Sequence, residues 1–78
     1  MLNTFVTSTN IDRVGYKYGK LFIQFKSGIV YQYDAVDKAM YDALIIAESA
    51  GKFFHRFIRS VYTYTKLPNN PFDKQTPA

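Results

Sequence analysis

Hydrophobic and polar positions alternate through three short segments in the first half of the chain. Residues 11–17 (IDRVGYK), 20–26 (KLFIQFK) and 28–34 (GIVYQYD) are rich in β-branched and aromatic residues, and glycines stand between them. Because successive side chains of a strand point to opposite faces, this pattern predicts a three-stranded antiparallel meander with a buried face and an outer face. The buried face would carry Leu21, Ile23, Phe25, Ile29, Tyr31 and Tyr33, and the outer face Phe22 and Val30.

The hydrophobic spacing changes from two residues to three or four after Asp34. Met40, Tyr41, Leu44 and Ile45 recur at the spacing of one helix face. Asp37 can cap the start of this segment, whose polar side would carry Lys38 and Asp42. The sequence therefore predicts a helix of about three turns, the usual length in globular proteins.

A second helix is predicted from about Ala50 to Val61, with Ser49 as its N-cap. At about 100° per residue, three basic side chains fall within roughly 60° of one another, and an aromatic and aliphatic stripe lies opposite. The basic stripe consists of Lys52, Arg56 and Arg59, and the opposite stripe, which we expect to be buried, consists of Phe54, Phe57, Ile58 and Val61.

These elements predict an α+β fold: a three-stranded antiparallel meander followed by two helices packed on one face, with a short C-terminal extended segment. The alternation of residues 62–65 (YTYT) supports that last segment. Three prolines follow Leu67, so we expect a single domain over residues 1–67 and a disordered tail over 68–78. The N-terminus turns polar almost at once and no apolar run approaches the roughly 20 residues of a bilayer span, which predicts a cytoplasmic protein without a membrane partner.

Composition narrows the chemistry that this domain can perform. The chain has 78 residues, seven Tyr, seven Phe, one His and no Cys, so disulfides and thiolate-bound metals are excluded. The carboxylates are scattered near element ends, and neither a nucleophile elbow of the G-x-S-x-G type nor a phosphate loop occurs. We therefore expect a non-catalytic protein without a metal or cofactor.

The formal net charge of +4 is confined to the last part of the sequence. Bases and acids balance over residues 1–48, whereas residues 49–78 hold five bases and one acid, Asp73. A field of a single sign attracts phosphates, although a solvated helix face has the same composition.

Candidate binding residues follow from this basic segment. Ser49 and Gly51 open the second helix, where they either expose backbone N–H groups to a phosphate or simply form a corner between the helices. Tyrosines that reach the surface beside the basic stripe could stack on bases, although rings of this kind are core residues by default. The candidate phosphate ligands are Ser49, Gly51, Lys52, His55, Arg56, Arg59 and Lys66, and the candidate stacking residues are Tyr31, Tyr33, Tyr62 and Tyr64.

The order of several short motifs resembles the KTSC domain, over about Val6 to Leu67. These motifs include Tyr31-x-Tyr33, Ser49-x-Gly51-x-x-Phe54 and Ile58-Arg59-x-x-Tyr62. This small domain occurs at the C-terminus of some lysyl-tRNA synthetases and as stand-alone bacterial and phage proteins. The resemblance implies the family's fold, and its attachment to a synthetase suggests RNA binding. Two positions differ from the usual pattern: Asp37 stands where the family has Pro, and His55 where it has Asn.

Two functions remain open at this point. The first is a nucleic-acid-binding accessory module, with RNA a better candidate than DNA, that acts through the basic segment. The second is a small inhibitor or interaction protein of the phage type, which binds a host protein or sequesters a phosphorylated nucleotide in the host cytoplasm. Under either hypothesis, Phe22 and Val30 on the outer face could support a homo-oligomer.

Overall fold

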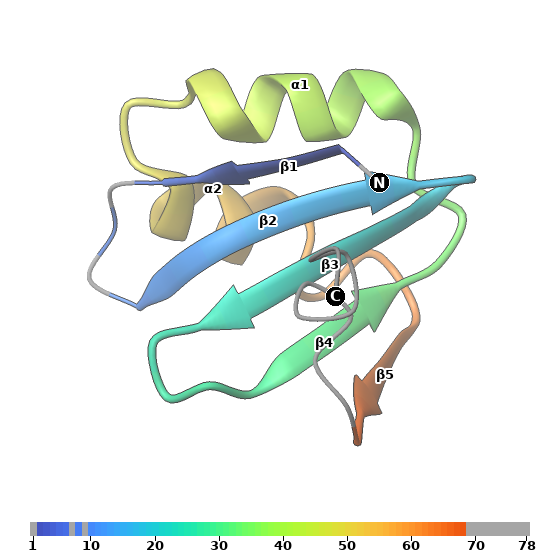
Figure 1. Cartoon of the computed structure of the whole chain (residues 1–78). Helices are drawn as coiled ribbons and strands as arrows, with labels where there is room; N and C mark the ends of the chain where they lie inside the picture. The colour runs from blue at the N-terminus through green and yellow to red at the C-terminus, as the bar shows by residue number, and fades with distance from the viewer. Residues whose placement is uncertain (1, 7, 9, 69–78) are drawn as a thin grey trace.

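The computed structural model describes residues 2–6, 8 and 10–68, so the tail predicted over residues 68–78 lies outside the described residues except for Pro68. Five strands and two helices follow one another along the chain, with both helices between the fourth and fifth strands (Figure 1). The strands are β1 (Leu2–Phe5), β2 (Ile11–Lys17), β3 (Lys20–Phe25), β4 (Val30–Tyr33) and β5 (Tyr64–Leu67), and the helices are α1 (Lys38–Ile46) and α2 (Ala50–Phe57).

All five strands form one antiparallel sheet in the order β1-β2-β3-β4-β5. The α+β class is confirmed, and the predicted meander corresponds to β2, β3 and β4. The prediction of only three strands is wrong, because β1 pairs with β2 at one edge and β5 pairs with β4 at the other. The short, partly polar β1 segment (LNTF) has no hydrophobic alternation of its own to reveal a strand, and its pairing depends on β2.

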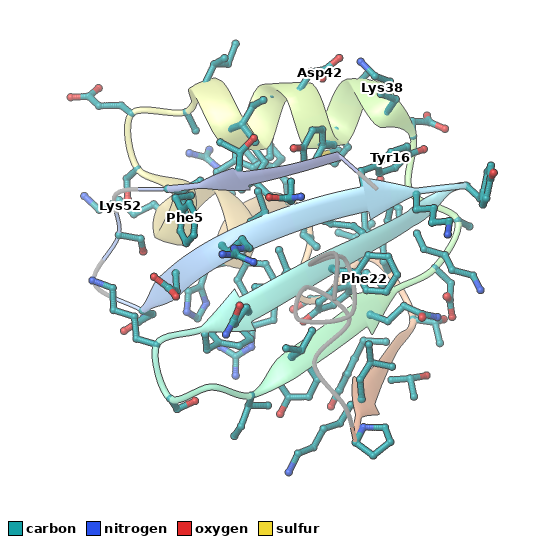
Figure 2. The ribbon with its side chains drawn as sticks, in the orientation of Figure 1. Phe5, Tyr16, Phe22, Lys38, Asp42 and Lys52 are labelled. Atoms are coloured by element: carbon teal, nitrogen blue, oxygen red, sulfur yellow. The ribbon has the colours of Figure 1, made fainter. Side chains whose placement is uncertain are left out.

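Helix α1 lies where the sequence places it. Tyr41 and Leu44 are buried, while Lys38 and Asp42 form an exposed ion pair of 3.1 Å on the side away from the sheet (Figure 2). Asp37 occupies the N-cap position, but its side chain makes no capping hydrogen bond. On the inner side, the Tyr41 hydroxyl lies 3.0 Å from the Thr4 hydroxyl of β1, which joins the helix to the edge strand.

Helix α2 is shorter than predicted. It ends at Phe57 rather than Val61, because Ile58 leaves the helical conformation with φ −120° and ψ −51°. The backbone N–H groups of Ile58 and Arg59 both donate to the carbonyl of Phe54 and close the last turn. Ile58 thereby stays buried, whereas Phe57 and Val61 are 44% and 65% exposed, so the prediction that these two residues belong to the buried stripe is wrong.

The main core lies between the helices and one face of the sheet, and it contains most of the residues that the alternation assigns to the buried face. Ile29 is an exception at 37% exposure, because it precedes β4 and the alternation does not extend to it. Phe22 and Val30 lie on the other face, as predicted, and both are buried in a small second cluster with Leu67. Neither helix of the described residues is long and apolar enough to cross a membrane.

Candidate nucleic-acid interface

A basic groove of about 800 Å³ lies between the start of α2 and the chain around the β2–β3 pair. Lys26 follows β3 directly and its backbone N–H donates to the carbonyl of Asn10, which brings the ends of these two strands together. Lys52, at the start of α2, lines this groove together with Ser8 and Asn10. The residues that line this groove are Ser8, Asn10, Lys26, Ser49, Gly51, Lys52, His55 and Arg56.

The wall of the basic groove depends on a cap and a close approach at the start of α2. The Ser49 hydroxyl accepts a hydrogen bond of 3.3 Å from the backbone N–H of Lys52, which confirms Ser49 as the N-cap. A Cβ at Gly51 would lie 3.0 Å from the hydroxyl oxygen of Ser8, so only glycine fits there without displacing Ser8. That oxygen in turn accepts from the N–H groups of Asn10 and Ile11. Ser49 and Gly51 therefore form a corner that positions the basic side chains.

An aromatic pocket of about 380 Å³ opens next to the basic groove. Five rings form a closed circuit around it: each ring contacts the next, with centroids 5.2–5.7 Å apart. Tyr33 and Phe54 are nearly inaccessible at 3% and 4% and form its floor, whereas Tyr64 is 55% exposed. In circuit order the rings are Phe25, Tyr31, Tyr64, Tyr33 and Phe54.

His55 and Arg59 stand at the mouth of the aromatic pocket, together with Ser60. An Arg59 Nη1 atom lies 3.2 Å from Nδ1 of His55. Because a guanidinium group can only donate, Nδ1 of a neutral His55 accepts this hydrogen bond and Nε2 carries the proton. Arg59 is thus held by His55 at the pocket, on the turn that follows α2.

Burial also affects the acidity of the pocket floor. Desolvation raises the pKa of the Tyr33 hydroxyl from 10.0 to about 12, and the neighbouring Tyr64 and Tyr31 add to this effect. The Tyr33 hydroxyl therefore keeps its proton, and its ability to donate a hydrogen bond, between about pH 10 and 12, where an ordinary tyrosine loses it.

The two hollows belong to one surface. His55 lines both of them, and a third hollow of about 350 Å³ shares Asn10 and Lys26 with the basic groove and Phe25 and Tyr31 with the aromatic pocket. Among the described residues, none that lines these three hollows is acidic. The continuous surface therefore combines positive charge with aromatic rings.

The predicted site residues divide between these hollows. Ser49, Gly51, Lys52, His55 and Arg56 line the basic groove, and Arg59 with Tyr31, Tyr33 and Tyr64 lines the aromatic pocket. Lys66 is exposed on β5 and pairs with Tyr31 across the strands, so it lies on the same face. Tyr62 packs against the main core and lines none of the hollows described here.

The predicted site residues leave out eight residues that line these hollows: Ser8, Asn10, Phe25, Lys26, Ser27, Ile29, Phe54 and Ser60. Asn10 directly precedes the predicted first strand and Lys26 ends the predicted second strand, so the register of an antiparallel pair was the available signal for their proximity. Phe25 was assigned to the buried face. In the structure it packs against the main core and also lines the aromatic pocket.

The architecture defines the chain as a small α+β domain with both helices against one face of an antiparallel sheet. Residues 7–62 match the KTSC domain family, and the chain belongs to this family. It is also similar to a crystal structure of a KTSC domain protein from Yersinia pestis, with a TM-score of 0.76 and 31% sequence identity over 83% of this chain and 94% of that one. No curated protein matches the sequence.

Proposed function

We propose that this domain is a non-catalytic module that binds single-stranded nucleic acid, with RNA as the preferred partner. The observation that supports this function is the continuous surface in which Lys26, Lys52, Arg56 and Arg59 adjoin a ring-lined pocket, and none of the described residues that line its three hollows is acidic. Glu48 lies in a separate hollow that Lys52 and Arg56 also line. Lysine and arginine neutralise backbone phosphates, and aromatic side chains stack on bases whatever their sequence. A single strand offers both groups on one flexible chain, whereas a duplex hides its bases.

A salt titration of binding tests this proposal directly. Fluorescence anisotropy would be measured with labelled RNA and DNA strands of mixed sequence, of about eight nucleotides, and with the matching duplexes. If three or four phosphates are neutralised, the logarithm of the binding constant falls with the logarithm of salt concentration at a slope of about −2 to −3. Absence of binding to every single strand at about 50 mM salt would refute the function.

A pair of charge reversals locates the binding surface. Lys52→Glu places a carboxylate in the basic groove, and a glutamate at this helix position also favours a capping box with Ser49, so the fold is retained. Affinity should fall about tenfold, equivalent to about 1.4 kcal/mol, with a slope shallower by about 0.7. Lys20→Glu changes the net charge equally but lies at the opposite end of β3 from Lys26, and it should leave the affinity within about twofold, a difference of less than about 0.5 kcal/mol.

Interaction with a host protein is the second candidate function. Exposed hydrophobic side chains support it, because Ile46, Val61 and Phe57 are 81%, 65% and 44% exposed. Capture of a single stoichiometric protein by the unmodified domain, retained at a salt concentration that abolishes nucleic-acid binding, would favour this candidate over the first.

A further inference from the structure

The aromatic pocket has the size of a small-molecule site, and its floor is fixed by core packing. Its volume of about 380 Å³ lies within the range of about 300–1,000 Å³ that is usual for ligand pockets. Tyr33 and Phe54 at its floor are almost fully buried and contact each other and the neighbouring rings. A floor fixed by core packing is formed before any ligand arrives, so little ordering of the floor is required on binding.

We propose that the aromatic pocket binds one nucleobase that carries a phosphate, with the base against Tyr31 and Tyr64 and the phosphate on Arg59. This inference rests on the proposed function, because it assigns one unit of the nucleic acid to one hollow of the surface. It goes further by separating a site that recognises a base from the groove that holds the backbone.

The two outer tyrosines supply the surfaces that a planar base requires. Their ring centroids are 5.2 Å apart and their planes are nearly perpendicular, at 89°. A base that stacks on the face of one ring can therefore present its own edge to the face of the other, which is a favourable aromatic arrangement. Tyr31 is half-buried and Tyr64 is 55% exposed, so this corner is open to a ligand while the floor beneath it is closed.

The charges at the mouth of the pocket select among ligands that bind aromatic rings. Quaternary ammonium groups also prefer such surroundings. Here Arg59 and His55 stand at the mouth and none of the described residues that line the pocket is acidic, so a cation would be repelled. A guanidinium group instead forms forked hydrogen bonds with a phosphate, and Nε2–H of His55 adds a donor beside it.

Polar groups within the pocket are available for the edge of a base. Within the described part of the chain, the hydroxyl groups of Tyr31, Tyr33 and Tyr64 make no hydrogen bond to another residue. Each hydroxyl can donate one hydrogen bond and accept others. A nucleobase carries donors and acceptors along its edge, whereas a purely aliphatic ligand would leave these hydroxyls without partners.

The experiment compares probes that have bases with probes that lack them. Binding of the full chain would be measured with a single-stranded RNA of about eight nucleotides, with the same backbone made entirely of abasic sites, with adenosine 5′-monophosphate and with ribose 5-phosphate. We expect the intact strand to bind roughly 5- to 150-fold more tightly than the abasic strand, as one stacked base contributes. If adenosine 5′-monophosphate binds more tightly than ribose 5-phosphate, the pocket accepts a free nucleotide. If only the RNA strand binds, the pocket accepts a nucleotide that is part of a strand.

Tyr64→Leu removes one ring at an exposed position, so the fold should survive. It should reduce the preference for the intact strand to below about threefold, less than the contribution of one stacked base, and leave abasic binding unchanged. Tyr18→Leu is the matched control, because Tyr18 is 88% exposed in the turn between β2 and β3 and lines none of the three hollows. In the unmodified protein, the NMR resonances of the ring protons of Tyr31 and Tyr64 should shift on addition of probes that contain a base and stay unchanged on addition of probes that lack one.

The possible failures are distinguishable. Equal affinity for the intact and abasic strands would overturn the pocket proposal while the proposed function stands. Binding of the monophosphate without binding of any strand would overturn the proposed function while the pocket proposal stands. If no probe binds, both are wrong.

Discussion

Replacement of Ser49 by alanine or by aspartate should separate the stability of α2 from the charge of the basic groove. Ser49 caps α2 through its hydrogen bond with the backbone N–H of Lys52, and its side chain also lines the groove. Ser49→Ala removes the cap and leaves the charge unchanged. Ser49→Asp keeps an N-cap of equal quality but adds a negative charge next to Lys52.

The magnitudes follow from the position of the residue. Loss of an N-cap serine costs about 0.5–2 kcal/mol, and the half-buried Ser49 should lie near the middle, at about 1 kcal/mol. In a domain of this size that loss lowers the melting temperature by about 4–8 °C. A carboxylate at the N-terminus of a helix is favourable by about 0.3–1 kcal/mol, so Ser49→Asp should melt at the same temperature as the unmodified protein or slightly above it.

Two measurements at low salt should separate the variants: thermal unfolding followed by circular dichroism, and strand binding followed by fluorescence anisotropy. Each variant should change one of these properties and leave the other unchanged. Ser49→Ala should melt earlier and, well below its melting temperature, bind as tightly as the unmodified protein. Ser49→Asp should keep its stability and bind several-fold more weakly. An unchanged melting temperature for Ser49→Ala would refute the role of the cap. Undiminished binding by Ser49→Asp would show that strands do not pass along this groove.

Two further predictions concern the ring circuit. Phe54 is 4% exposed and contacts the rings of Phe25 and Tyr33, so Phe54→Ala should cost about 3–5 kcal/mol in chemical denaturation, with Phe54→Leu retaining most of the stability; a loss below about 1 kcal/mol would contradict this packing. Burial raises the pKa of Tyr33 to about 12, above the value near 10 in the unfolded chain. The stability that the protonated Tyr33 hydroxyl contributes to the folded state is therefore fully present below pH 10, and it is lost as the pH rises from about 10 to 12. The free energy of unfolding of Tyr33→Phe should therefore fall less steeply over that interval than that of the unmodified protein, and parallel curves would refute this linkage.

The parts of the fold that the sequence revealed are those with a strong local pattern. Alternation in β2, β3 and β4 and the spacing of Tyr41 and Leu44 in α1 led directly to those elements. The edge strand β1 was missed, because its stability depends on pairing with β2 rather than on its own residues. Helix α2 was extended too far, because nothing in a periodic pattern shows that Ile58 leaves the helix to remain in the core.

In the candidate site, too, the features that a local sequence pattern encodes could be predicted, and those that depend on distant residues could not. Residues close together along the chain, from Ser49 to Arg59, were found from charge and capping signals. Their division between two hollows was not foreseen, since it depends on the end of α2 and on the turn that carries Arg59. The contributions of Asn10 and Lys26 depend on strand register, which links residues that are distant in sequence.

Because β5 carries Tyr64, the aromatic pocket exists only while this edge strand is paired with the sheet. Tyr33 and Tyr64 are paired across the sheet, although about 30 residues that include both helices separate them along the chain. Closing so long a loop costs entropy, and an exposed edge strand of four residues is among the first parts of a small domain to open locally. Each such opening removes Tyr64 from the ring circuit and disassembles the pocket. A ligand held there would consequently also fasten the last strand to the sheet, so that occupancy of the pocket and closure of the domain become linked equilibria.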